Sequence, residues 1–308
     1  MKTGIFLSYK GLGANLLHLS YCHQVAKKFG PISLITLCPN LDKVLKDDPS
    51  FKEIIYLDKF HRKFFDIIRL SNFLKQFNFD NIFIFYPSIR HYLSSKLARI
   101  KNIYHYPLFK KKNLHLVKAA KKFTEESLNI ENCPTETKIS IDYSKIDKYK
   151  INNLKKIVLG ISSSGPTTKW GYENFTKLIM KLNEHDNFYF YLLCGQNDEK
   201  DAQKIINKVG EKNCMSLGTK DVSEIIYYIY CSDIFIGNDS FGHHVSSQMS
   251  KPSFVILLDS PKAYSDYSKN QKRIIPPNID INQINHGSNL NPNSITVDMV
   301  LEKVKDFI

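Results

Sequence analysis

The stretch with the most chemical potential in this sequence is residues 236–252, IGNDSFGHHVSSQMSKP, between an apolar run and a helical pattern. Small polar groups at such a junction can bind an anion, because a helix begins with unpaired N–H groups and the positive end of its dipole. Asp239 could instead cap the helix, but a cap needs neither the asparagine nor the two histidines. His244, about one turn in, is expected to face the same ligand. No further carboxylate or cysteine has metal-ligand spacing, so we predict no metal.

A second loop, 160–170, reads GISSSGPTTKW and directly follows another apolar run. Its hydroxyls and backbone amides could surround a phosphate, and Lys169 would add a point charge. The order of Gly and Lys is not that of a Walker A loop. A serine-rich surface loop is the alternative interpretation.

A third loop, 9–19, reads YKGLGANLLHL and follows the first apolar run. Gly11 and Gly13 would let the backbone turn tightly and approach a ligand, although the spacing of a dinucleotide site is incomplete. Asn15 and His18 are the nearby side chains able to act on a substrate hydroxyl. An ordinary strand-to-helix turn is the alternative.

Short apolar runs alternate with helical patterns, which predicts βαβ units and parallel sheets. Strands are predicted at 3–9, 32–37, 53–57, 81–86 and 102–106, and again at 156–161, 188–194, 213–217, 233–237 and 253–258. The pattern lapses in the polar segment 132–156, which is typical of an interdomain connection. We therefore predict two doubly wound α/β domains, 1–150 and 151–308, the second closing with a helix at 294–307. Ligands of such sheets bind beyond the carboxyl ends of the strands, where the three loops lie.

The net charge is +13, from 43 Lys and Arg against 30 Asp and Glu. This excess favours an anionic partner or reflects a lysine-rich composition throughout. Its densest part, 109–122, contains six lysines but no nucleic-acid-binding motif.

No apolar run approaches the ~20 residues of a membrane span. The N-terminus lacks the features of a secretory signal, and the cysteines are scattered. We expect a cytoplasmic protein with reduced thiols that does not bind nucleic acid.

The stretch DIFIGNDSFGHHVSSQMSKPSFVIL resembles the nucleotide-sugar signature of glycosyltransferase family 9, the heptosyltransferases of bacterial lipopolysaccharide cores. That signature reads roughly Asn-Asp-Ser/Thr-Gly-Pro-x-His, then small residues, then Lys-Pro before a strand. The matching positions are Asn238, Asp239, Ser240, His244, Ser246, Ser247, Lys251 and Pro252. Three other stretches, SSSGPTTKWGYENFTKLI, LLCGQNDEKDAQKI and SLGTKDVSEIIYYI, are similar to further segments of the family.

The resemblance implies a GT-B fold, in which two Rossmann-like domains face a cleft, with the donor on the second and the acceptor on the first. It places Glu199 at the nucleotide ribose and the backbone near Lys220 at the base. Charge growing on the leaving diphosphate would be stabilised by the helix N-terminus and the phosphate loop. The residues implied there are Thr167, Thr168, Lys169, Ser240 and Gly242.

Two departures from the family pattern bear on mechanism. Phe241 and Gly242 stand where the family has Gly-Pro, so Phe241 would alter the backbone's approach to the phosphates or stack on a sugar. The family's general base is an aspartate in the first loop, and here the matching position is Ala14. Deprotonation of the acceptor then falls to Asn15, a poor base, or His18. Loss of a positioned base typically costs ~10²–10⁴ in rate.

We therefore expect an inverting glycosyltransferase that needs no metal. The resemblance implies ADP-heptose as donor and a lipid-linked core oligosaccharide or another anionic surface glycan as acceptor. The lysines of 109–122 could meet acceptor phosphates and the inner membrane face, each worth ~1 kcal/mol near an anionic surface. The alternatives are a transferase of another nucleotide sugar and a binding relative impaired by the change at Ala14.

Overall fold

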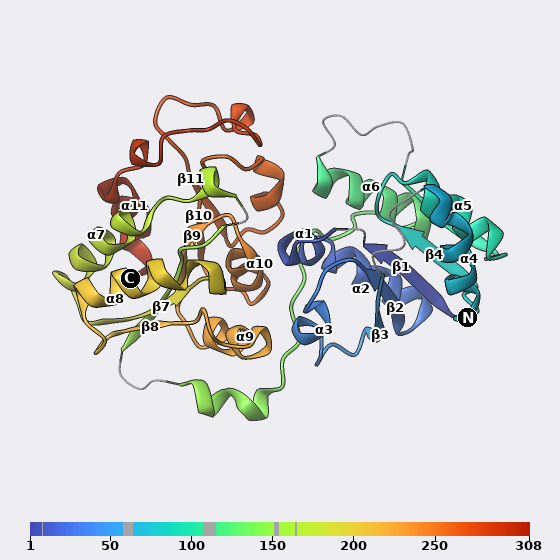
Figure 1. Ribbon diagram of the computed structural model, residues 1–308, viewed down its shortest axis with the longest axis horizontal. Coiled ribbons are helices and arrows are strands. Elements are labelled where there is room, and N and C mark those ends of the chain that lie inside the picture. The colour runs from blue at the N-terminus through green and yellow to red at the C-terminus, as the bar shows by residue number, and fades with distance from the viewer. Residues whose placement is uncertain (8, 58–63, 107–114, 151–153, 164) are drawn as a thin grey trace. The chain divides into compact units, whose positions relative to one another are not determined.

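The computed structural model describes residues 1–7, 9–57, 64–106, 115–150, 154–163 and 165–308. These residues form two compact units, Met1–Ser140 and Ile141–Ile308 (Figure 1). The division falls inside the polar segment 132–156. Residues 109–114 of the basic segment, with three of its six lysines, lie outside the described residues. Among the residues described, no helix is both long and apolar enough to cross a membrane.

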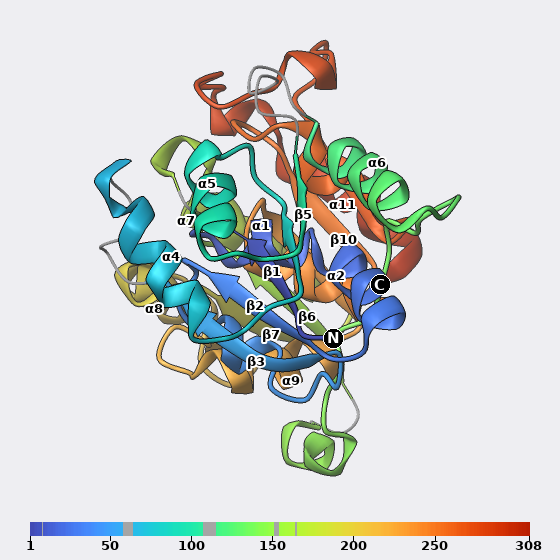
Figure 2. The ribbon, with the colours of Figure 1, turned by 90° about the vertical axis from the view of Figure 1, so that its right-hand side faces the viewer.

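The first unit is built on a five-stranded parallel sheet with the strand order β3-β2-β1-β4-β5. Figure 2 shows α2 and α6 on one face of this sheet and α4 and α5 on the other. The strands are β1 (Thr3–Leu7), β2 (Ile32–Thr36), β3 (Phe51–Tyr56), β4 (Asn81–Ile84) and β5 (Asn102–His105). The helices are α1 (Leu12–Leu16), α2 (Leu19–Phe29), α3 (Leu41–Val44), α4 (Ile67–Lys75), α5 (Ile89–Leu97) and α6 (Leu116–Leu128).

The second unit is built on a six-stranded parallel sheet with the order β11-β10-β9-β6-β7-β8. In Figure 1, α7, α8 and α11 cover one face and α9 and α10 the other. The strands are β6 (Lys155–Gly160), β7 (Phe188–Leu193), β8 (Cys214–Ser216), β9 (Ile234–Asn238), β10 (Ser253–Ile256) and β11 (Gln271–Ile274). The helices are α7 (Tyr172–Asn183), α8 (Glu199–Val209), α9 (Val222–Tyr230), α10 (Phe241–Gln248) and α11 (Val297–Val304). Short 3₁₀ turns include η4 (Pro166–Thr168), η5 (Gln196–Asp198) and η9 (Lys305–Phe307).

The central strands are apolar because helices cover both of their faces. Every residue of β1, β2, β4, β9 and β10 is buried, as expected of parallel strands between two helical layers. The flanking helices are amphipathic and turn one apolar side to the sheet. This confirms the prediction of two α/β units with parallel sheets.

Local structure differs from the sequence predictions in three places. The helical pattern that follows the first predicted strand forms two helices and not one, because α1 and α2 are separated at residues 17–18. The strand β11 was not predicted, because its sequence QKRI has no apolar run and Lys272 is exposed at the sheet edge. The closing helix is shorter than 294–307, since Thr296 caps α11 through its side chain and the chain tightens into η9 after Val304.

The strand order fixes where a ligand of the second unit can bind. Connections run from β6 outward to β7 and β8, whereas β9 lies on the other side of β6 and leads to β10 and β11. The order therefore reverses between β6 and β9, and ligands of open α/β sheets bind outside such a reversal point. The segments that leave these two strands are 161–170 and 239–240, the second leading directly into α10, and they lie in two of the three stretches singled out from the sequence.

Candidate donor site

Asn238, at the end of β9, fixes the loop that follows β6. Its side chain is fully buried. Its Oδ1 accepts a hydrogen bond from the Trp170 backbone N–H at 2.9 Å, and its Nδ2 donates to the Ile161 carbonyl at 2.9 Å. One amide thus holds both ends of the 161–170 loop. Buried backbone groups bonded in this way keep the loop in one conformation.

Hydroxyl groups join that loop to the neighbouring ones. Ser163 Oγ donates to the Asp239 carbonyl at 3.2 Å and makes a short contact with Thr168 Oγ1. Thr168 is buried and donates to the Gly165 carbonyl at 2.8 Å, so it supports the loop from within. Thr167 is exposed and donates through a short hydrogen bond to a carboxylate that follows β10, Asp259.

Lys169 lies at the end of the same loop with its side chain 29% exposed. Its Nζ is 2.6 Å from Asp198 Oδ1, and Asp198 Oδ2 accepts from Ser162 Oγ at 2.6 Å. Asp198 ends η5, so the ion pair connects the loops that follow β6 and β7. A partly exposed ammonium at the reversal point is a suitable partner for an anion.

Glu199 and the segment before Lys220 come together beside this ion pair. Glu199 Oε2 accepts from Ser216 Oγ at 2.6 Å, and Oε1 accepts from Gln203 Nε2 at 2.8 Å. Ser216 ends β8, and the Lys220 N–H donates to the Leu217 carbonyl in the turn that follows. The carboxylate predicted to meet a ribose therefore also anchors the turn predicted to meet a base.

The helix α10 begins at the reversal point with its first turn uncapped by its own N-cap residue. The Ser240 side chain accepts no hydrogen bond from that turn. The backbone at Gly242 packs so closely that an added Cβ would lie 2.4 Å from Leu193 Cδ2 and 2.5 Å from Phe235 Cε2. Glycine at this position lets the helix N-terminus approach the sheet. Phe241 is the first residue of α10 and is partly exposed.

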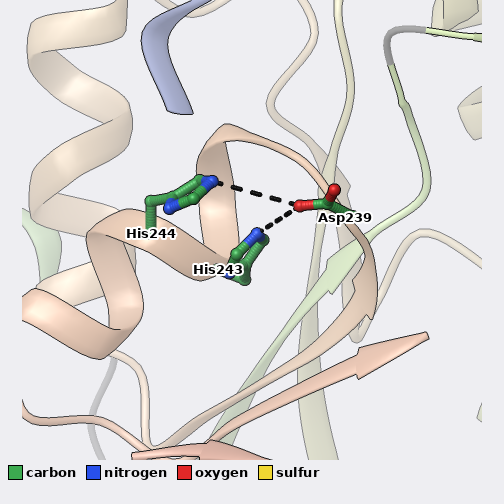
Figure 3. Close-up of side chains that lie close together, drawn as sticks. All are labelled: Asp239, His243 and His244. Atoms are coloured by element: carbon green, nitrogen blue, oxygen red, sulfur yellow. Dashed lines mark hydrogen bonds and ion pairs between the residues drawn. The ribbon is translucent and has the colours of Figure 1, made fainter. Parts of the chain in front are cut away.

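Asp239 turns its carboxylate to two histidines of α10, His243 and His244 (Figure 3). Its Oδ1 is 2.6 Å from His243 Nε2 and 4.0 Å from His244 Nε2. Burial by itself would raise the pKa of Asp239, but the hydrogen bond from His243 and the neighbouring imidazoles hold it below its usual value. Burial lowers the pKa of His244 well below its usual value, so His244 is neutral at physiological pH.

These three side chains are close enough to suggest a metal site, since their possible ligand atoms lie within 4.8 Å of one another. The proton positions oppose it. Gln271 Oε1 accepts from the N–H groups of Tyr267 and Ser268, so Gln271 Nε2 donates to His243 Nδ1 at 3.2 Å. His243 must then carry its proton on Nε2, which points at Asp239. A metal requires that nitrogen unprotonated, so the cluster does not fit a metal ion.

In the first unit, the two polar side chains predicted in the loop after β1, Asn15 and His18, are buried within the protein. Asn15 is 2% exposed. Its Nδ2 donates to the carbonyls of Tyr9 and Gly11 at 3.1 and 2.7 Å, and its Oδ1 accepts from Thr36. Asn15 thus braces the loop. Gly11 has an ordinary φ of −83° and open space around an added Cβ, so glycine is not required at this position, and Gly13 lies inside α1.

His18 is fully buried against aromatic rings. It stacks on Tyr9 with ring centroids 4.8 Å apart and meets the edge of Phe85 at 5.8 Å. Its Nδ1 is 2.7 Å from the Ala14 carbonyl, which can only accept, so Nδ1 carries the proton. Nε2 is buried without a partner among the residues described. The tautomer suits a base, whereas the burial keeps His18 away from an acceptor.

A model of glycosyltransferase family 9 (heptosyltransferase) matches residues 94–280, more than half of the chain. The chain belongs to glycosyltransferase family 9. The solved structure of E. coli ADP-heptose LPS heptosyltransferase II is similar to it, with a TM-score of 0.76 at 14% identity over 100% of this chain and 98% of that one. The structure of E. coli heptosyltransferase WaaC with ADP gives a TM-score of 0.73 at 13% identity, with 100% of both chains covered.

A family 9 glycosyltransferase from Veillonella parvula is similarly related, with a TM-score of 0.75 at 15% identity over 99% of this chain and 96% of that one. No curated protein is significantly similar in sequence. At such low identities the solved structures show the fold, which is GT-B. The chain is therefore a family 9 glycosyltransferase on a GT-B fold, as the sequence predicts.

Several residues around the candidate donor site were not predicted. They are Asp198, His243, Asp259, Gln271 and Ser260, whose side chain hydrogen-bonds to Asp239. The spacing of four residues between Asp239 and His243 in a helical stretch could have indicated their contact. Asp259 and Ser260 directly follow the apolar run 253–258, the same signature that drew attention to the other loops. Nothing in the sequence pairs Asp198 with Lys169.

Burial of His18 gives the transferase a testable pH dependence. Burial lowers the pKa of His18 to about 4 from 6.5, against the opposing hydrogen bond to Ala14. Between these values the unfolded chain binds more protons than the folded one, so stability is present at higher pH and lost on acidification. The free energy of unfolding is expected to fall by about 3 kcal/mol between pH 6.5 and 4 through this group alone.

Denaturant unfolding across this pH range checks the expectation. His18→Phe keeps an aromatic ring and cannot titrate, so its curve should lack that part of the slope. His185→Gln, at an exposed position of the second unit, serves as the control and should follow the unmodified protein. A His18→Phe curve parallel to that of the unmodified protein would show that His18 is not held neutral by burial.

Proposed function

We propose that this glycosyltransferase transfers a sugar from an ADP-linked donor, ADP-heptose in the first instance, to a lipopolysaccharide-core-like or other surface glycan. The observation that supports it most is the convergence at the β6–β9 reversal of Lys169, the uncapped start of α10 and the hydroxyl-rich loop. Similar solved structures point the same way, since E. coli WaaC was solved with ADP and with ADP-2-deoxy-2-fluoro heptose.

In the proposed complex the diphosphate lies against the N–H groups of Ser240–Gly242 and the Lys169 ammonium, with the Thr167 hydroxyl beside them. Glu199 lies where the ribose would be, and the turn at Lys220 where the base would be. The contacts of these groups with the diphosphate are strongest when the sugar–phosphate bond breaks and negative charge grows on the diphosphate. They therefore assist departure of ADP and need no metal ion to do so.

The proposed transfer inverts the anomeric centre. The acceptor hydroxyl oxygen forms the new bond to the anomeric carbon from the face opposite the diphosphate, while the bond to the diphosphate oxygen breaks. The acceptor hydroxyl must also lose its proton, and without a positioned side-chain base the proton passes to solvent water. His18 has a lone pair on Nε2 but is buried, and Asn15 is occupied by backbone carbonyls. Transfer is thus expected to be slow compared with a relative that has a positioned carboxylate.

A second candidate is a relative that binds the donor and does not transfer it. The specific observation in its favour is the combination of Ala14 in place of the family's aspartate with burial of both nearby polar side chains, Asn15 and His18. Such a protein would keep the donor site of the second unit. A transferase of another nucleotide sugar is the remaining alternative, because the groups named above recognise a diphosphate and not a particular sugar.

The proposed acceptor and its location rest on charge alone. Lys118, Lys121 and Lys122 of the basic segment lie on α6, and the latter two pair with Glu125 and Glu126. From the charge of this segment we propose an anionic acceptor and a peripheral contact with an inner membrane. These proposals predict salt-sensitive binding to vesicles that contain acidic lipids.

Calorimetric titration with ADP, GDP, UDP and ADP-heptose, without metal and with a chelator, tests the proposed function. ADP-selective micromolar binding supports it, and selective binding of another nucleotide would replace the donor. Absence of all binding would overturn the donor site. Release of ADP from ADP-heptose with a heptose-deficient core lipid as acceptor then separates transferase from binder: binding without release would favour the binder.

A further inference from the structure

Lys169, the cation proposed for the diphosphate, already has an anionic partner. Its Nζ lies 2.6 Å from Asp198 Oδ1, with the two side chains 29% and 19% exposed. Asp198 is itself fixed, because Oδ2 accepts from Ser162 Oγ at 2.6 Å, and Ser162 Oγ accepts from the Gly195 N–H at 3.1 Å. The carboxylate is therefore held in place even when Lys169 moves.

Asp198 is an anion under physiological conditions. Burial by itself would raise its pKa, but hydrogen bonds from Lys169 and Ser162 hold the pKa below its usual value. An anionic carboxylate within reach of Lys169 repels a diphosphate that approaches the same ammonium. The ammonium has three donors and four rotatable bonds, so it can leave one anion for another.

We propose that Asp198 is the resting counter-ion of Lys169 and competes with the nucleotide diphosphate for it. This inference rests on the proposed function. When the donor binds, Lys169 exchanges a carboxylate for phosphate oxygens. The gain in binding free energy is then only the difference between these two contacts. After transfer, Asp198 takes Lys169 back and speeds the departure of ADP. Asp198 is thus a positioning residue that acts through Lys169 and lowers affinity for the product.

The decisive variant is Asp198→Asn, whose amide oxygen can still accept from Ser162 while the charge is gone. We expect its Kd for ADP to fall about 2- to 5-fold, the range of a partly exposed ion pair, and its ADP dissociation rate to slow by a similar factor in stopped flow. Its Kd for adenosine, which has no phosphate, should not change. In a Lys169→Ala background the gain should shrink, because there is no ammonium to compete for and only direct repulsion between Asp198 and the diphosphate remains.

Asp201→Asn is the matched control, since it removes the same charge from α8 three residues later, where Asp201 pairs with Lys204. It should leave ADP binding unchanged. Weaker or unchanged ADP binding by Asp198→Asn, an equal gain in Asp201→Asn, or a gain that is undiminished without Lys169 would each overturn the inference. Failure of the proposed function is a different result, namely no ADP binding by the unmodified protein.

Discussion

Lys169→Ala is expected to weaken ADP binding roughly 10- to 100-fold, the cost of one charge-assisted hydrogen bond to a phosphate. Two effects add in this variant. The diphosphate loses its cation, and Asp198 is left without its partner beside the incoming negative charge. Adenosine lacks phosphates, so its affinity should change little. Calorimetry with ADP and adenosine on the same protein preparations measures both.

Controls separate the local contact from overall charge. Lys177→Ala removes an exposed cation from α7 and should bind ADP like the unmodified protein. Lys169→Arg keeps the charge in a different geometry, so its affinity for ADP should lie between those of the unmodified protein and Lys169→Ala. If ADP and adenosine lose affinity equally in Lys169→Ala, the residue supports the fold of the loop and does not contact the diphosphate.

The parallel sheets could be predicted because their central strands are short apolar runs separated by amphipathic stretches. The run IFIG of β9, for example, is buried on both faces, as a strand between two layers of helices requires. The same reasoning misses β11, since an edge strand needs no continuous apolar run. Helix ends are harder to predict than helix centres, because they depend on caps such as Thr296 and not on periodicity.

The meeting of the loops that carry Lys169 and Asp239 could be predicted, because each loop follows a strand and parallel strands bring their carboxyl ends to one edge. The partners of these two residues could not. Asp198 and Gln271 reach the site from other loops, and only the folded register shows which atoms meet. The case of His18 is similar. Its spacing from Ala14 predicts nearness to the first loop, whereas its burial depends on Tyr9 and Phe85, whose packing the sequence does not specify.

Gly237→Ala is expected to destabilise the second unit by about 3 kcal/mol or more, at the upper end of overpacking substitutions. Gly237 of β9 lies opposite Gly160 of β6 in the parallel register. A Cβ on Gly237 would lie 2.6 Å from Gly160 Cα, N and O. These are backbone atoms, so no side chain can rotate away, and relief requires β6 and β9 to separate. For a unit of this size the midpoint of thermal unfolding should fall by about 6–12 °C.

Separation of these strands would also move the site, because the strands end in the two loops that meet at the reversal point. Asn238 is the next residue after Gly237, and its hydrogen bonds to Ile161 and Trp170 span the same gap. Folded Gly237→Ala protein should therefore bind ADP more weakly even below its melting temperature. Gly195→Ala is the stability control, since its φ is −83° and an added Cβ meets nothing within 4 Å. If Gly237→Ala melts and binds ADP like this control, the close approach of β6 and β9 is not what holds the two loops together.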